Sequence, residues 1–234
     1  MRESDRLRLA TFNLKHGAPA RGDQGDAEAV AAACAALEAD VLALQEVDVG
    51  LPRSGHADLA AAAAQASGMS LVFCPTMQIR GGQYGNALLV RGEIESHDVA
   101  ELDGPSEIEP RNVILATVRV GGHRLSVAAT HFATQSEVGR KQLSQAAMEL
   151  QRMPEPWLLM GDLNLTTEDV LAEPLLGSMQ LVRGPATFHA WRPRKRIDHI
   201  AVRGLALVAD SVRTVRSRRV SDHLALLADV AVPH

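Results

Sequence analysis

Polar side chains recur where apolar, strand-like runs of the sequence begin or end. They are carboxylates, carboxamides and imidazoles, namely Asn13, Glu46, Asn86, His131, Asp162, Asn164, Asp198, Asp222 and His223. Neither a cysteine nor an obvious serine nucleophile accompanies them. Oxygen-rich ligands of this kind select hard cations, and Mg²⁺ binds carboxylates together with waters and substrate phosphate oxygens. The set predicts metal-assisted attack of water on a phosphoester, with Mg²⁺ or Mn²⁺ as the cation.

The elements that must position these side chains are many strands and a few helices. Alternating or continuous apolar runs predict strands at 7–13, 41–46, 69–75, 86–90, 112–120, 124–132, 157–164, 196–204, 207–215 and 223–232. Helical spacing of Ala, Leu and Glu predicts helices at 25–39, 57–67 and 136–152. The two glycines of VGGH at 120–123 predict a β-hairpin. We therefore expect an α/β (α+β) architecture in which rigid strands hold the polar residues at one rim.

Composition limits the class of protein. The 234 residues are 46% hydrophobic and 22% charged, with a formal charge of −4, which fits one globular domain over residues 1–234. The aromatic residues are few, so aliphatic side chains must build the core. Cys34 and Cys74 lie in apolar surroundings and indicate small buried side chains in a reducing compartment, which excludes a disulfide scaffold. Without a signal-peptide or membrane-span pattern, we expect a cytoplasmic monomer.

Charge is unevenly distributed along the chain. Residues 183–234 hold 10 of the 24 basic residues but only 4 of the 28 acidic ones. Part of this excess, Arg192, Arg194, Lys195 and Arg196, lies directly before Asp198. Arginine pairs bidentately with phosphate, so this segment predicts an anionic substrate.

Seven short motifs occur in an order that resembles one known superfamily. They are TFN at 11–13, LQE at 44–46, YGNALL at 84–89, TH at 130–131, GDLN at 161–164, RIDHI at 196–200 and SDH at 221–223. Together they are similar to the endonuclease/exonuclease/phosphatase superfamily, which has the DNase-I-like fold, over residues 9–230. The resemblance implies a four-layered αββα sandwich of two mixed β-sheets, with helices outside and the site at one end.

The resemblance also assigns roles around the cation. Glu46 is similar to the principal metal ligand, with Asn13 beside it and Asp222 as a further ligand of the same cation. Asp162 matches the residue that positions or deprotonates the attacking water. Asn164 matches the amide that binds a phosphoryl oxygen.

Further roles concern the phosphate and the substrate. His223 resembles the histidine on the scissile phosphate, Asp198 the carboxylate that orients it, and His131 a group that assists the leaving oxygen. An Asp and His pair is chemically sensible because the carboxylate fixes the imidazole tautomer. Whether Asp162 or His223 is the general base stays open. The expected substrate-binding residues are Tyr84, Asn86, Arg111, Trp191 and Arg194.

The substrate itself stays open, because the scaffold implies the reaction and not the ligand. A phosphodiesterase or nuclease is favoured. The alternatives are a lipid-headgroup phosphoesterase, for which Trp191 and Leu51 are the only apolar loop candidates, an inositol-phosphate or small-molecule phosphoesterase, and a non-catalytic binding domain. Asp48 stands where nuclease members of the superfamily often carry a basic or polar residue, which argues against a nucleic-acid contact from that loop.

Overall fold

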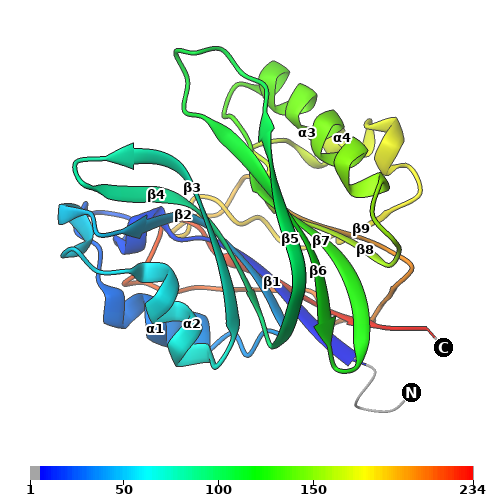
Figure 1. Cartoon of the computed structure of the whole chain (residues 1–234), viewed down its shortest axis with the longest axis horizontal. Coiled ribbons are helices and arrows are strands. Elements are labelled where there is room, and N and C mark those ends of the chain that lie inside the picture. Colours follow the sequence, from blue (N-terminus) through cyan, green and yellow to red (C-terminus); the bar gives the residue numbers. More distant parts are fainter. Residues whose placement is uncertain (1–5, 234) are drawn as a thin grey trace.

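Two mixed β-sheets form the centre of the protein, here described by a computed structural model of residues 6–233. The first sheet has the strand order β11-β13-β1-β2-β4-β3, with β12 also paired to β13. Its strands are β1 (Arg6–Asn13), β2 (Val41–Val49), β3 (Ser70–Ile79), β4 (Gly82–Val90), β11 (Ala206–Leu207), β12 (Arg213–Val215) and β13 (Ala225–Ala231). Figure 1 shows β1 to β4 side by side.

The second sheet has the order β5-β6-β7-β8-β10-β9. Its strands are β5 (Gly92–Leu102), β6 (Arg111–Val120), β7 (His123–His131), β8 (Trp157–Asp162), β9 (Gln180–Leu181) and β10 (Asp198–Arg203). The predicted hairpin is confirmed: β6 pairs antiparallel with β7, and Gly121 and Gly122 make the turn with φ of 57° and 86°, as a tight two-residue turn requires.

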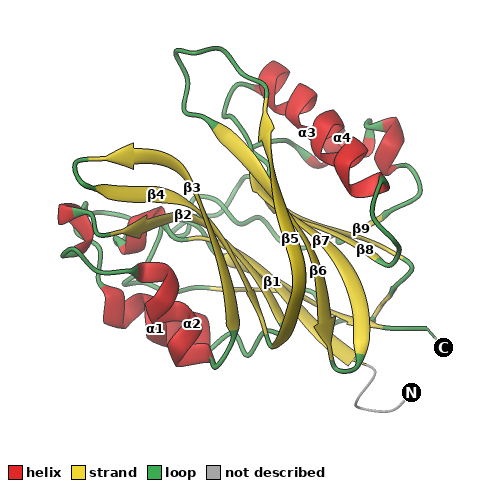
Figure 2. Ribbon diagram, in the orientation of Figure 1, coloured by secondary structure: helices red, strands yellow, loops and turns green. Residues whose placement is uncertain are grey.

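Helices cover the outer face of each sheet (Figure 2). The first sheet is covered by α1 (Ala27–Ala35) and α2 (Leu59–Ser67), and the second by α3 (Ser136–Gln151) and α4 (Thr167–Leu171). The described residues also form short 3-10 helices, namely η2 (Lys15–Gly17), η3 (Pro52–Ser54) and η4 (Pro174–Leu176). The result is the expected four-layered αββα sandwich. No helix of residues 6–233 combines the length and apolarity needed to cross a membrane.

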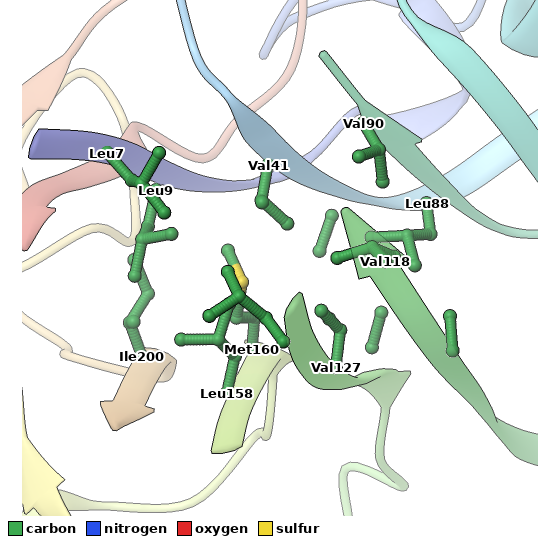
Figure 3. Packing of buried hydrophobic residues seen from close by; sticks show 14 of the residues in the cluster. Leu7, Leu9, Val41, Leu88, Val90, Val118, Val127, Leu158, Met160 and Ile200 are labelled. Carbon is green, nitrogen blue, oxygen red and sulfur yellow. The ribbon is translucent and has the colours of Figure 1, made fainter. Parts of the chain in front are cut away.

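An aliphatic core lies between the two sheets (Figure 3). Leu9 and Leu88 reach it from the first sheet, and Val127 and Met160 from the second. Side chains alternate between the faces of a strand, so Phe12 of β1 packs in the outer core beneath α1 and α2 instead. Within the described residues, the core between the sheets contains no aromatic side chain.

The strand directions bring the polar strand ends together. Each sheet contains one parallel pair, β1 with β2 and β7 with β8. Antiparallel neighbours flank both pairs, namely β13 and β4 in the first sheet and β10 and β6 in the second. The carboxyl ends of each parallel pair therefore share an edge with the amino ends of their antiparallel neighbours. Asn13, His131, Asp162 and Asp198 all lie at such ends.

The structure differs from the predicted elements in several places, among them the unpredicted short strand β9. The strand expected at 207–215 is broken into β11 and β12, because the chain between them turns at Ser211, whose hydroxyl donates to the Val208 carbonyl. Strand β5 was not predicted, since this edge strand is largely exposed and its sequence is correspondingly polar. Helix α4 was not predicted either, because its 5 residues are too few for a periodic pattern. The capping box of Thr166 and Asp169 begins that helix.

Candidate active site

A cleft of about 1010 Å³ opens at the edge where the polar strand ends meet. Nine of the expected site residues line it: Glu46, Tyr84, Arg111, His131, Asp162, Asn164, Arg194, Asp222 and His223. Asn13 and Asp198 lie behind its wall, buried and in hydrogen-bond contact with residues of this set. The two sheets therefore contribute to one site.

The side chain of Asn13 joins the two sheets. Its Nδ2 donates to Glu46 Oε1 at 2.9 Å and to Asp162 Oδ2 at 3.0 Å. Its Oδ1 accepts from the Lys15 amide at 3.0 Å. With both amide groups bound, Asn13 has one orientation, and it fixes the carboxylates of Glu46 and Asp162 beside each other.

Glu46 occupies a strained position in β2. Its φ is 55°, and the pairing of β2 with β4 shifts register between Leu44 and Val47. A bulge adds a residue to one strand and turns a side chain out of the regular alternation. Backbone strain of this kind concentrates at functional sites. Here it directs the Glu46 carboxylate into the cleft.

His223 lies between two buried carboxylates. Its Nδ1 is 2.9 Å from Asp198 Oδ2, and its Nε2 is 3.7 Å from Asp162 Oδ2. Burial lowers the pKa of His223, but the charges of Asp198 and Asp162 outweigh this effect and raise it above its usual value. Burial and the charge of Asp198 raise the pKa of Asp162. Ligand atoms of these three residues lie within 4.8 Å of one another, close enough to hold a metal ion.

His131 has a different set of partners from His223. Its Nδ1 lies 2.9 Å from Nη1 of Arg111, and its Nε2 lies 3.2 Å from Nδ2 of Asn164. Burial lowers the pKa of His131 well below its usual value, and the charge of Arg111 adds to this effect. Asn164 also donates to the Phe132 carbonyl at 3.0 Å. His131 is therefore a buried, neutral imidazole that Arg111 holds through Nδ1.

The glycine of the GDLN motif has a packing reason. A Cβ on Gly161 would lie 1.9 Å from the carbonyl oxygen of Thr130 on the adjacent strand β7. Only glycine lets β7 and β8 pair here, and this pairing sets His131 opposite Asp162 in register.

Two expected substrate contacts are not brought to the cleft wall. Asn86 is buried and donates to Asn112 Oδ1 at 3.1 Å, so its amide ties strands β4 and β6 together between the sheets. Trp191 is 60% exposed and lies outside the cleft lining, with Arg21 against its ring. The aromatic ring that lies near Asp222 is that of His189, whose Nε2 is 4.0 Å from Asp222 Oδ2.

The cleft also contains charged residues that the sequence patterns did not identify. Arg53 of η3, Lys15 of η2 and Glu109 before β6 all line it. None belongs to a motif, but an acid at position 48 followed by an arginine 5 residues later marks a possible ion pair. The structure shows this pair: Arg53 binds the fully buried Asp48 through Nε and Nη2, at 2.8 and 2.7 Å.

A sandwich of two mixed sheets with carboxylates and imidazoles at one edge defines the DNase-I-like class of fold. The chain belongs to the Endonuclease/Exonuclease/phosphatase family, whose sequence profile matches residues 10–223. Members of this family hydrolyse phosphoesters. No curated protein sequence matches the chain significantly.

Solved structures agree on the fold. An endonuclease/exonuclease/phosphatase from Beutenbergia cavernae DSM 12333 has a TM-score of 0.78 at 23% identity, over 97% of this chain and 72% of that one. A mannosyl-6-phosphatase from Bacteroides thetaiotaomicron VPI-5482 has a TM-score of 0.72 at 17% identity, over 96% and 99%. The human Nocturnin catalytic domain, with a bound sulfate anion, has a TM-score of 0.69 at 18% identity, over 98% and 95%.

Proposed function

We propose that the protein is a divalent-metal-dependent phosphoester hydrolase that cleaves a P–O bond by attack of water. The observation that carries this proposal is the bridge formed by Asn13, which sets the Glu46 carboxylate beside that of Asp162. In this proposal the Glu46 carboxylate binds the cation, and the Asp162 carboxylate acts on a water next to it.

The donor set fits Mg²⁺ or Mn²⁺. Within residues 6–233, no Lys, Arg or His nitrogen lies within 4.0 Å of the Glu46 carboxylate, and Asn13 is its hydrogen-bond donor. Asp222 lines the same cleft and has His189 as its nearest cationic partner, at 4.0 Å. These are oxygen donors without a competing ammonium or guanidinium, as a hard cation requires. A cation held by Glu46 and Asp222, with Asn13 fixing the Glu46 carboxylate, would neutralise charge on the phosphoryl oxygens.

The remaining residues have separate roles in the proposal. Asp162, next to the cation ligands and with a raised pKa, positions the attacking water and accepts its proton. His223, oriented by Asp198, presents Nε2 to the scissile phosphate. Asn164 and His131 donate hydrogen bonds to phosphoryl and leaving-group oxygens.

A phosphodiester is the substrate class we favour. Arg194 lines the cleft together with Lys195 and Arg196, so the basic segment before Asp198 lies where it can bind phosphate. Asp48 is buried against Arg53 and does not face the substrate, which removes the objection to a phosphate contact from that loop. The mannosyl-6-phosphatase on the same fold keeps a small-molecule phosphoester as the second candidate.

The test is hydrolysis of bis-p-nitrophenyl phosphate with Mg²⁺, with Mn²⁺ and with EDTA. We expect turnover that depends on the divalent cation and is lost in EDTA. Turnover that persists in EDTA, or no turnover of any phosphoester with either metal, would contradict the proposal.

A further inference from the structure

We propose that Arg53 binds a second phosphate group of the substrate, next to the phosphoester that is cleaved. The inference rests on the proposed function and narrows its substrate class to molecules that carry two phosphates. It does not depend on the basic segment around Arg194.

The first observation is that Arg53 is fixed in place. The side-on edge of its guanidinium, Nε and Nη2, donates to both oxygens of Asp48. Asp48 is fully buried, so this carboxylate cannot move to another partner. The guanidinium carbon also lies 5.4 Å from the ring centroid of Tyr84, within the range of a cation–π contact. An arginine held from two sides loses little further side-chain freedom when it binds a ligand.

The second observation is that the opposite edge of the guanidinium has no partner. Arg53 makes no hydrogen bond through Nη1 to any residue of 6–233, and its side chain is 39% exposed on the cleft wall. The end-on fork of Nη1 and Nη2 presents two parallel N–H groups, which match two oxygens of a phosphate.

The third observation is that the neighbouring cations already bind protein groups. Arg111 donates to Glu109 at 2.7 Å and faces His131. Lys15 donates to the carbonyls of Pro19 and Gly22 at 3.1 and 2.8 Å. The side chain of Arg111 is only 6% exposed, whereas that of Arg53 is 39% exposed and its Nη1 is unbound within residues 6–233.

The position of Arg53 separates it from the reacting phosphate. Along the edge of the first sheet, His223 precedes β13 and Glu46 lies on β2, whereas Arg53 packs on Tyr84 of β4, beyond Glu46. Arg53 also borders a second hollow of about 290 Å³ lined by Leu51, Pro52, Ile79 and Arg80. A substrate bound to both His223 and Arg53 must extend past the cation ligands, and the hollow gives it room to continue.

Asp48 offsets the charge of Arg53, so selectivity depends on the direction of two N–H groups more than on net charge. Binding by Arg53 therefore differs from the general attraction of anions to a basic surface. A lysine at this position would keep the charge but lose the fork.

The experiment compares two matched pairs of substrates in the presence of Mg²⁺. The first pair is dithymidine monophosphate and its 5′-phosphorylated form. The second pair is glucose 6-phosphate and glucose 1,6-bisphosphate. We expect kcat/KM to favour the doubly phosphorylated member of at least one pair by about 10- to 100-fold, as a charge-assisted bidentate contact provides. The pair that responds tells whether the second phosphate belongs to a nucleotide or to a small molecule.

The variants are Arg53→Lys and Arg53→Gln, and we expect both to bring the ratio of kcat/KM close to one. Since Arg53→Gln leaves Asp48 buried and unpaired, the double variant Asp48→Asn/Arg53→Gln is measured as well, with thermal unfolding to confirm that each variant is folded. Arg152→Gln is the control, because Arg152 is an exposed arginine at the end of α3, paired with Glu149 away from the cleft. It should keep the wild-type ratio.

Different results would overturn the role of Arg53 and the proposed function. The role of Arg53 is overturned if the wild-type enzyme shows no preference within either pair. It is also overturned if the preference survives Arg53→Gln in a folded protein. A wild-type protein that hydrolyses none of the four compounds, nor bis-p-nitrophenyl phosphate, overturns the proposed function instead.

Discussion

Nη1 of Arg111 lies 2.9 Å from Nδ1 of His131. Arginine only donates hydrogen bonds, so Nδ1 must accept, and the single proton of the neutral imidazole is on Nε2. Nε2 lies 3.6 Å from Asp162 Oδ2 and borders the cleft. His131 is thus a fixed donor toward the reacting groups. It cannot serve as a general base while Arg111 occupies its other nitrogen.

If Arg111 acts through His131, then Arg111→Gln should lower kcat about 10-fold, because the tautomer is no longer fixed by a charge. The same substitution in a His131→Ala background should have little further effect. A double-mutant cycle of kcat measures this coupling. Additive losses would show that Arg111 contacts the substrate directly. ¹⁵N shifts of the His131 ring would report the tautomer independently.

Asp198→Asn tests the orientation of His223. Asparagine keeps the shape but removes the charge that fixes and stabilises the imidazole, so we expect kcat to fall by about 100-fold or more, with KM nearly unchanged. Steady-state kinetics provide both values. Asp98→Asn, on the exposed strand β5, is the matched control and should behave as wild type. A large rise in KM with kcat intact would instead place Asp198 in substrate binding.

Glu46→Gln tests the cation site with minimal change of shape, since Gln can still accept from Asn13. The Mg²⁺ concentration for half-maximal activity should rise about 10-fold or more, because a neutral amide is a weaker ligand for a hard cation than a carboxylate. His223→Ala should instead lower turnover while leaving that concentration nearly the same. Metal titrations of activity compare the two variants, with Glu137→Gln on α3 as the control. The reverse pattern would refute the assignment.

The architecture follows from patterns that the sequence shows directly. Alternation in β1, the glycine turn after Val120 and the helical spacing in residues 136–152 are each set by local physics and match the structure. Strand β5 and helix α4 could not be predicted, because one is a polar edge strand and the other spans a single turn of helix.

The site was predictable as a set of residues but not as a network. Motifs identify Glu46 and Asp162, yet only folding reveals that Asn13 bridges them, because the contact joins two sheets across 149 positions. The motif around Asn86 predicts a substrate contact, but in the structure its amide donates to Asn112 on the other sheet. Arg53 belongs to no motif, and although its spacing from Asp48 fits an ion pair, the sequence does not show that Asp48 is fully buried or that Arg53 lines the cleft.

Asp229 predicts a loss of stability in acid. Its carboxylate on β13 is buried and accepts from Nε of Arg6 and of Arg8, at 3.0 and 3.1 Å. Burial alone would raise the pKa of Asp229, but these hydrogen bonds outweigh it and hold the pKa below its usual value. A carboxyl with a depressed native pKa stabilises the fold above its unfolded-state pKa, and this contribution is lost as pH falls through the native one.

The variant Asp229→Asn should therefore lower the free energy of unfolding by about 2 kcal/mol at neutral pH, since both arginines are partly exposed and the ion pairs are screened. The difference from wild type should shrink as pH falls below about 4. Urea unfolding at a series of pH values measures it. A difference that stays constant with pH would mean that the carboxylate charge contributes nothing.

The core between the sheets also acts as a spacer. The first sheet carries Glu46, whereas the second carries Asp162 and Asp198, so the thickness of this aliphatic layer sets the separation of metal ligand and base. Val127 and Leu88 are far from any substrate, yet a change in their volume alters the distance across which the reaction occurs. Displacements of about 1 Å can cost 100-fold in rate, so the catalytic geometry of this protein is encoded in hydrophobic residues that never touch the phosphate.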